Sequence, residues 1–428
     1  MDIARRAARG RHATALAAMA VSALVLSACG QSAGQVTSEA RASATADGVY
    51  DASVVHSIAI ELDPDDYADM VTSYQDTGDK EWIEATVAID GVTFEQVGLR
   101  LKGNSTLRTV SVDSDPAGVP WLIKLDEFVE GQELDGQSQF VVRASSGATA
   151  LNEAVALDLL EMSGLAAQKA MATRLSVNGG EEVLRLVVQN LDGTWEEENF
   201  DTGGVLYKAE AGGDYSYRGD DPTAYEDVFD QETDSDEEDL HPLIDFLEFV
   251  NNSDDETFSA ELGEYLDVEA FANYLAFEEL IANDDDIDGP GNNSYLRLDE
   301  ETGRFTVVAW DHNGAFGGFV RTDGAAGGMR PDGGGGHAAG AAGAAPRGGR
   351  EDVSNVLVDR FKADAEFGAL YEQAASDLRE SLFVSGEAED VLQGWVDLLS
   401  EQAGDLVDQE TIESEAGIVR AVIEASHR

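Results

Sequence analysis

The stretch LIANDDDIDGPGNNSYLRLD, residues 280–299, joins two kinds of secondary structure through a loop crowded with acidic and amide side chains. Its first residues end a segment with helical spacing, whereas SYLRLD at its other end alternates as a strand does. Five of the six residues from Asn283 to Asp288 are acidic or amide. Because carboxylate and amide oxygens are ligands for divalent cations, two different chemistries can use such a loop.

The first candidate is a calcium loop of the D-x-D-x-D-G form. Asp284, Asp286 and Asp288 would be the ligands, and Gly289 would make the sharp turn. The match fails at the last position, where a calcium loop needs a bidentate Glu and this chain has Tyr295. The following residues also predict a strand and not the exiting helix of an EF-hand, so calcium binding is the weaker alternative.

The second candidate is phosphoryl transfer, in which one Asp of the loop is the base while an Asn and a later Asp hold magnesium. A predicted helix ends at Asn283, the acidic loop and Asn293 follow, and a predicted strand pair then leads to Asp311. Protein kinases use this order because the base must lie near the acceptor hydroxyl and the metal must neutralise the phosphates. His312 has no evident partner and is expected at the surface.

The residues before the loop predict mainly strands. The alternating stretch HSIAIELD begins at His56, a helix start with proline and acids follows it, and Asp90-Gly91 is a strong hairpin signal between two alternating runs. Further predicted elements are a strand over 121–128, a helix from Leu151 and a second hairpin at Asn178-Gly179. The first part of the chain is therefore expected to be rich in strands.

The later residues predict mainly helices. Helical spacing occurs near residue 245, in the segment that ends at Asn283, and again from Glu351 onward. The stretch 226–239 holds nine acidic residues and predicts a solvated loop. Residues 323–350 are rich in Gly and Ala, a composition that cannot bury a core, and predict a mobile loop.

The composition is strongly acidic. The 428 residues include 85 Asp and Glu against 27 Lys and Arg, which gives a formal net charge of −58. Such a field repels nucleic acid, so no nucleic-acid partner is expected. Basic protein partners and metal ions are favoured instead.

The N-terminus has the pattern of an export signal. Arginines in the first eleven residues precede an apolar run from Ala15 to Leu26, and the run ends in Leu-Ser-Ala-Cys at Cys29. This ending resembles the lipobox of bacterial lipoproteins, and Cys29 is the single cysteine of the chain. We therefore expect a signal peptide over 1–28, lipidation of Cys29, a flexible tether over 29–52, and an exported lipoprotein anchored on the outer face of the cell membrane.

Several stretches together resemble the CotH kinase family, the spore-coat-type atypical protein kinases. They occur in the order found in that family and cover about 57–318: GLRLKGNSTLR, WLIKLDEF, LNEAVALDLLEMSGL, LSVNGGEEVLRLVVQNLD, GVLYKAE, LIANDDDIDGPGNNSYLRLD and FTVVAWDHNGAFGG. The resemblance implies an ATP-dependent protein kinase that uses Mg²⁺ or Mn²⁺ and phosphorylates Ser or Thr hydroxyls. With the acidic charge, it favours a basic, Ser/Thr-rich protein substrate.

The resemblance also implies roles for acidic and amide residues of the loop region. Asp285 matches the catalytic Asp of the family's N-x-D motif. Asn293 matches an amide that ligates metal, and Asp311 matches the metal-binding Asp of the W-D motif.

Basic residues of the family-like stretches are implied to bind the nucleotide. Lys124 looks like the strand lysine that grips the phosphates, and Arg100 and Lys102 look like the phosphate-facing segment. Lys208 belongs to another motif of the family, and the resemblance assigns it no role.

Two residues depart from the family pattern. Asn313 stands where the family usually has a second Asp, which weakens the case for a second metal, and Gln189 stands where the family commonly has Glu. The alternative function is therefore a catalytically inactive, kinase-like surface lipoprotein that acts by binding or as a structural protein.

The expected fold class is α+β, with the two lobes of a protein kinase. A CotH-like kinase domain over 53–428 would consist of a strand-rich lobe over about 53–210 and a mainly helical lobe over about 211–428. The catalytic loop would lie where the two lobes meet.

Overall fold

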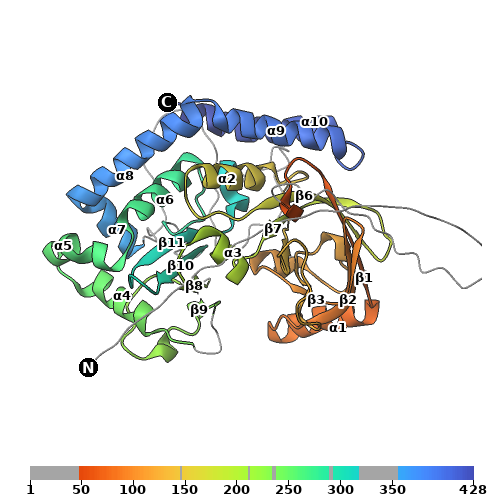
Figure 1. Cartoon of the computed structure of the whole chain (residues 1–428), viewed down its shortest axis with the longest axis horizontal. Coiled ribbons are helices and arrows are strands. Elements are labelled where there is room, and N and C mark those ends of the chain that lie inside the picture. Colours follow the sequence, from red (N-terminus) through yellow and green to blue (C-terminus); the bar gives the residue numbers. More distant parts are fainter. Residues whose placement is uncertain (1–47, 145–146, 211–212, 234–237, 289–292, 318–354) are drawn as a thin grey trace, which may run out of the picture. The chain divides into compact units, whose positions relative to one another are not determined.

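The computed structural model describes residues 48–428, except 145–146, 211–212, 234–237, 289–292 and 318–354 (Figure 1). The described residues belong to one compact unit. The predicted signal peptide, Cys29, most of the predicted tether and the Gly/Ala-rich segment 323–350 lie outside them. No helix among the described residues is both long enough and apolar enough to span a lipid bilayer.

Seven strands of the first part of the chain form a closed barrel in the order β1-β2-β3-β4-β5-β7-β6. The strands are β1 (His56–Leu62), β2 (Ile83–Ile89), β3 (Val92–Leu101), β4 (Trp121–Lys124), β5 (Gln139–Val142), β6 (Ala170–Val177) and β7 (Val183–Gln189). Both predicted hairpins are confirmed. Asp90 and Gly91 form the two-residue turn between Ile89 and Val92 and have the positive φ angles that such a turn requires. Asn178 and Gly179 also have positive φ angles, in the longer turn between β6 and β7.

The barrel contradicts the expected two-lobed protein-kinase-like fold, and that prediction is wrong. Strand β1 pairs antiparallel with β2 on one side and parallel with β6 on the other, for example Ile58 with Leu175, so the sheet has no free edge there. Closure is favourable because it pairs edge groups and encloses an apolar interior. The inward side chains, such as Ile60, Leu99 and Trp121, are fully buried.

A second sheet of four strands has the order β11-β10-β8-β9. Its strands are β8 (Gly204–Ala209), β9 (Phe229–Gln231), β10 (Ser294–Asp299) and β11 (Phe305–Ala309). Strand β9 lies inside the acidic stretch 226–239, so the prediction of a loop is wrong for these three residues. The strand pair predicted after Asn293 is confirmed as β10 and β11.

The helices supply most of the remaining core. They are α1 (Pro64–Thr77), α2 (Leu151–Met162), α3 (Gly193–Asn199), α4 (His241–Asn252), α5 (Asp255–Tyr265), α6 (Val268–Leu280), α7 (Val356–Ala363), α8 (Ala365–Leu378), α9 (Glu387–Gln402) and α10 (Gln409–Ser426). Short helical turns include η2 (Ser105–Thr109), η3 (Pro116–Gly118), η6 (His312–Gly317) and the π-helix η7 (Arg379–Val384).

Helix α2 joins the barrel to the rest of the molecule. Outward side chains of the barrel, such as Leu122, Val141 and Leu186, belong to the same apolar core as the buried face of α2. On its other side α2 packs against α9 and α10, and α6 packs against α8 and β11 (Figure 1). The first residues of α2, the end of α6 and the end of β11 are thus held by one continuous core.

Candidate functional site

The second sheet and α6 deliver the predicted acidic and amide residues to one place. Asp285 follows the end of α6, Asn293 immediately precedes β10, and Asp311 lies two residues after the end of β11. Because Ser294 pairs with Ala309 in the antiparallel register, the start of β10 and the end of β11 lie at the same edge of the sheet. The antiparallel pairing therefore explains why residues 18 positions apart along the chain can share a site.

Asn293 contacts Asp285 directly, and Asp311 lies close enough for its charge to act on Asp285. The Asn293 side chain donates from Nδ2 to the backbone oxygen of Asp285 at 2.9 Å and also forms a hydrogen bond with the Asp285 carboxylate. Burial raises the pKa of Asp285, the nearby charge of Asp311 raises it further, and the hydrogen bond from Asn293 opposes these effects. The structure thus brings together the residues that the sequence placed in one site.

The backbone around this site adopts an unfavourable conformation at several positions. Ala282, Asn293, Asp311 and Phe316 all have φ between 51° and 67°, the left-handed region that side chains with a Cβ avoid. The Phe316 amide donates to the carbonyl of Ile281 at 2.7 Å, which holds the segment after Asp311 against the end of α6. Such backbone conformations persist where surrounding contacts hold them in place, and they are concentrated at functional sites.

Arg143, one residue beyond β5, forms an ion pair with Asp311 through its Nη2 atom. Its Nε atom lies 2.8 Å from Oε1 of Glu153 on α2, and both Arg143 and Glu153 are buried. The two carboxylates outweigh the burial of the guanidinium, so the pKa of Arg143 is raised and the side chain stays charged. Sequence reasoning missed both residues, although an arginine directly after the apolar run Phe-Val-Val is a signal of a buried charge that needs partners.

A cluster of four basic side chains lies on the nearby part of the barrel and second sheet. Lys80, Arg100, Lys102 and Lys208 are each partly buried and close enough to perturb one another electrostatically. Burial lowers the pKa of Lys102 to about 8; Glu232 opposes this shift, while the other cations of the cluster add to it. Sequence reasoning identified Arg100 and Lys102, but it missed Lys80, which the fold brings in from the loop before β2.

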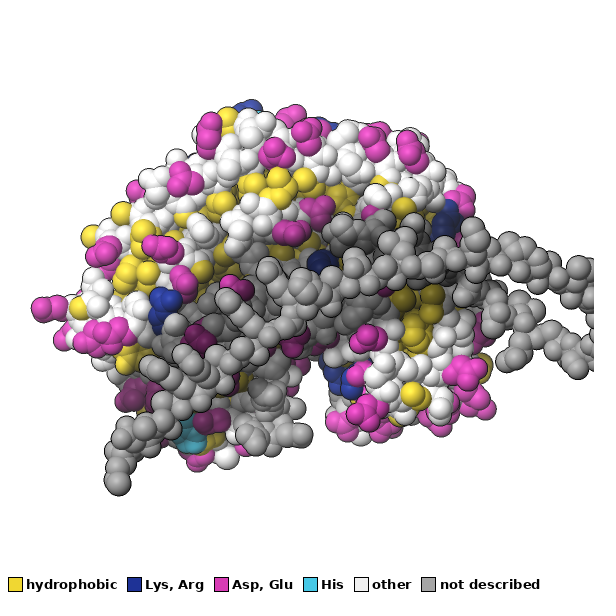
Figure 2. Space-filling view, in the orientation of Figure 1, with side chains coloured by type: hydrophobic (Ala, Val, Ile, Leu, Met, Phe, Trp, Pro, Cys, Tyr) yellow, Lys and Arg dark blue, Asp and Glu magenta, His cyan; other side chains and the backbone are white. Residues whose placement is uncertain are grey.

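Cation clustering is costly in general, and here it occurs in a protein of net charge −58. Figure 2 shows acidic side chains spread over the visible face and basic side chains in only a few places, one of them a compact group near the barrel. The Nε atom of Arg100 is buried and lacks a hydrogen-bond partner within the described part of the chain, while its guanidinium lies over Trp82, 4.7 Å from the ring centroid. These features favour an anionic ligand.

Trp310 connects the basic cluster to Asp311. Lys102 Nζ and the Arg143 guanidinium carbon each lie 5.5 Å from the centroid of the Trp310 ring, within the range of cation–π attraction. The ring also packs edge-on against Tyr295, with centroids 5.8 Å apart. The cations and Asp311 are therefore parts of one site.

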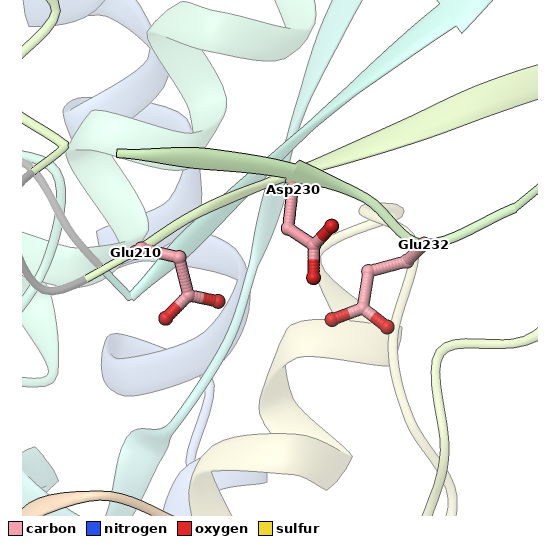
Figure 3. A group of neighbouring side chains, drawn as sticks. All are labelled: Glu210, Asp230 and Glu232. Carbon is pink, nitrogen blue, oxygen red and sulfur yellow. The ribbon is translucent and has the colours of Figure 1, made fainter. Parts of the chain in front are cut away.

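A group of three carboxylates borders the basic cluster. Glu210 follows β8, Asp230 lies on β9 and Glu232 follows β9, and their carboxylates point to the same side of the strands (Figure 3). One oxygen from each lies within 4.8 Å of the others. Lys208 pairs with Glu210 and lies 3.6 Å from Glu232, so this lysine neutralises part of the group.

Lys124, at the end of β4, pairs with a nearby glutamate. Its Nζ atom pairs with Oε2 of Glu127 at 2.9 Å, and within the described ranges no hydrogen bond or ion pair links it to Asp285 or Asp311. Gly98, opposite Lys124 in the strand pair, makes room for Glu127, because a Cβ at Gly98 would lie 2.5 Å from the Glu127 Cβ. Nucleotide binding by Lys124 stays a prediction.

The residues of the alternative calcium loop do not converge. Asp284 is exposed, Asp286 is buried, and Asp288 pairs with Lys362 at 2.8 Å. The backbone amide of Asp288 also donates to the Asp286 carboxylate at 3.0 Å, and this hydrogen bond stabilises the loop. The calcium alternative therefore receives no support from the positions of these side chains.

His312 is fully buried, so the expectation of a surface histidine is wrong. Its Nε2 atom lies 3.0 Å from Oε1 of Glu278 on α6, and this buried pair holds the segment after Asp311 against α6.

The two residues that depart from the family pattern, Gln189 and Asn313, lie in separate surroundings. Gln189 donates to Glu198 at 2.9 Å, and the backbone oxygen of Asn313 accepts from Asn152 at 2.6 Å.

The donor set fits a hard divalent cation. Asp311 and Asp285 offer carboxylate oxygens and Asn293 offers an amide, and oxygen ligands of this kind suit Mg²⁺ and Mn²⁺. Glu153 and Asp311 both pair with the Arg143 guanidinium, and the charge of Asp311 also acts on Asp285.

Comparison with known proteins identifies the family. The profile of the family described as CotH kinase protein matches residues 99–414, which is most of the chain. The chain is also similar to inner spore coat protein H of Bacillus subtilis (strain 168), with 24% identity over 168 residues. That alignment covers 38% of this chain and 45% of the relative, so the chain matches less than half of the relative's length. The extent of the profile match shows that this protein belongs to the CotH family.

Proposed function

We propose that this protein is a metal-dependent phosphotransferase that moves the γ-phosphoryl group of ATP to Ser or Thr hydroxyls of proteins. The observation that carries the proposal is the meeting of Asp285, Asn293 and Asp311 beside a cluster of four cations in a strongly acidic protein. Acidic and amide oxygens for a cation, next to basic groups for an anion, are the parts that phosphoryl transfer requires.

Asp285 is the proposed base. Its pKa is raised by burial and by the charge of Asp311, which makes the carboxylate a better proton acceptor than an exposed Asp. The hydrogen bonds from Asn293 orient it. The proton of the acceptor hydroxyl would pass to this carboxylate as the hydroxyl oxygen attacks the γ-phosphorus and the bond from that phosphorus to the leaving ADP breaks.

The basic cluster is the proposed site for the phosphates. Lys102 is linked to Asp311 through Trp310 and Arg143, because its ammonium group and the Arg143 guanidinium both lie near the Trp310 ring. Arg100, Lys80 and Lys208 add positive charge around it. Asp311 and Asn293 would hold a Mg²⁺ or Mn²⁺ ion, which when bound neutralises charge on the transferring phosphoryl group.

The proposed substrate is a basic protein rich in Ser and Thr. The acidic surface would steer such a protein by long-range attraction (Figure 2). We further propose that the protein acts outside the membrane, attached through a lipid on Cys29. Both points rest on the sequence.

The decisive experiment measures transfer from γ-labelled ATP, with Mg²⁺ or Mn²⁺, to the protein itself and to a basic Ser-rich protein. We expect Asp285→Asn to reduce transfer by about 10²–10⁴-fold, the usual contribution of general base catalysis. Asp311→Asn should also reduce metal-dependent transfer strongly, because a proposed ligand of the metal is lost. Asp284→Asn is the matched control, because Asp284 is the exposed neighbour of Asp285 and should retain full activity.

Absence of transfer from a folded wild-type protein that still binds ATP would contradict the proposal. The alternative of an inactive binding lipoprotein would then be favoured. Equal loss of activity in Asp284→Asn and Asp285→Asn would instead show that charge of the loop, and not a specific base, is needed.

A further inference from the structure

Several hydrogen bonds hold the backbone of Arg143 in place. A side chain that only balances charge would not require them. Its backbone amide donates to the carbonyl of Leu186 at 2.9 Å, and its own carbonyl accepts from Nε of the buried Arg185 at 3.1 Å. Arg185 also donates to the carbonyl of Ala117 at 2.9 Å. The end of β5, and with it the start of the Arg143 side chain, is therefore anchored on both sides.

The guanidinium is shared between two carboxylates with different surroundings. Glu153 lies on α2 with a side chain that is 5% exposed, and its two oxygens lie 2.8 and 3.0 Å from Nε of Arg143. Asp311 has a side chain that is 26% exposed and meets Nη2. The buried carboxylate therefore holds Arg143 permanently, whereas the more exposed carboxylate can exchange partners.

We infer that Arg143 is a positioning residue that acts as the internal counter-cation of Asp311, held in place by Glu153, and that it competes with a divalent cation for the Asp311 carboxylate. This inference rests on the proposed function, because it takes Asp311 as a ligand of the cation. When no cation is bound, Arg143 holds the Asp311 carboxylate in place through the ion pair.

Competition follows from charge and position. A cation on Asp311 would lie close to a guanidinium that Glu153 prevents from moving far, and two positive charges in a partly buried site repel each other strongly. A divalent cation adds two charges where Arg143 supplies one, so it can displace the guanidinium from Asp311. After displacement, the Nη2 donor of Arg143 points toward the site and away from the buried Glu153. An anionic oxygen in the site could then accept a hydrogen bond from it.

The test is Mn²⁺ binding to the purified full chain, measured by titration calorimetry without nucleotide in 150 mM salt. Salt screens weak binding to the exposed acidic surface. Asp311→Asn identifies the part of the signal that depends on Asp311. We expect Arg143→Gln to tighten the Asp311-dependent binding of Mn²⁺ by about tenfold or more, because the competing charge is removed.

The opposite change is expected from Glu153→Gln. Without the charge of Glu153, Arg143 is attracted to Asp311 alone, so Mn²⁺ binding should weaken several-fold. A purely structural role for the pair predicts a different result, namely that both substitutions weaken binding or leave it unchanged. Opposite signs therefore exclude a purely structural role, and the variant that removes both charges tests competition separately from net charge.

Folding requires its own control. Arg143→Gln leaves Glu153 buried without its counter-charge, which can prevent folding. The double variant Arg143→Gln/Glu153→Gln removes both charges and keeps a polar side chain at each position, and it should also bind Mn²⁺ more tightly than the wild type. If Arg143→Gln does not fold, the double variant decides the question.

The outcomes separate the inference from the proposed function. Asp311-dependent binding in the wild type that is unchanged or weakened in the folded Arg143 variants would overturn the inference and leave the proposed metal site standing. Absence of Asp311-dependent binding from the wild type and from every folded Arg143 variant would overturn both. Binding that appears only after Arg143 is replaced would support the inference in its strongest form.

Discussion

The pKa of Lys102 reflects both its burial and the charges around it. Burial is the main cause that lowers its pKa to about 8 from 10.5, and the neighbouring cations add to the shift. The folded state therefore releases a proton between pH 8 and 10.5 that the unfolded state keeps. The charge on Lys102 costs stability below pH 8, and this cost disappears as the pH rises through that window.

Binding of an anion should reverse the shift. A phosphate next to Lys102 favours the charged form, so ATP binding at pH 8 should take up a substantial fraction of a proton. Titration calorimetry in two buffers of different ionisation enthalpy measures this uptake directly. Lys102→Arg keeps the charge at pH 8 and should bind ATP without the uptake, whereas equal uptake in both proteins would place the proton elsewhere.

At the scale of elements, α10 fixes the connection between β5 and α2. The Glu415 carboxylate on α10 accepts from the backbone amides of Ala148 and Thr149 at 2.8 and 2.9 Å, and from the Thr149 hydroxyl. These amides precede the first turn of α2, whose Glu153 holds Arg143. A helix near the C-terminus thus sets the position of a side chain that comes from the middle of the chain.

Removing this cap should affect both stability and function. We expect Glu415→Ala to lower the free energy of unfolding by about 1–3 kcal/mol, because charge-assisted hydrogen bonds are lost and backbone amides are left without partners. Phosphoryl transfer should fall as well, because the Glu153–Arg143 pair loses its support. Glu424→Ala is the control, since Glu424 is exposed on the same helix, and chemical denaturation with a transfer assay measures both effects.

At the scale of the whole molecule, the closed barrel makes the N-terminal strand part of the main core. Ile60 on β1 is fully buried inside the barrel, next to β2 and β6. We expect Ile60→Ala to cost about 2–5 kcal/mol of unfolding free energy, as for other large-to-small changes in a core. Glu61→Ala, one residue further and facing solvent, should change it little.

Amide hydrogen exchange distinguishes a closed barrel from an open sheet. In the closed barrel the amides of β1 should be protected as strongly as those of β6, because β1 is paired on both sides. Rapid exchange along β1 beside slow exchange along β6 would contradict closure. This measurement tests the very feature that separates the observed fold from the expected one.

Local signals identified the elements because the relevant physics is local. Alternation along His56–Leu62, the turn residues Asp90-Gly91 and the helical spacing before Asn283 each depend on neighbours in sequence, and all three predictions are confirmed. The joint position of Asp285, Asn293 and Asp311 could also be expected, since a helix end and one antiparallel hairpin suffice to bring them together.

By itself, the sequence indicated many of the strands and helices, grouped Asp285, Asn293 and Asp311 as one candidate site, and showed which family the chain resembles. Only the tertiary structure decided that β1 closes on β6, that Arg143 and Glu153 join the site, and that Lys80 and Lys208 surround Lys102. The physical reason is the range of the interactions. Strand and turn propensities act between neighbours, whereas barrel closure and buried charge pairs join residues far apart in sequence and become favourable only when the whole core forms.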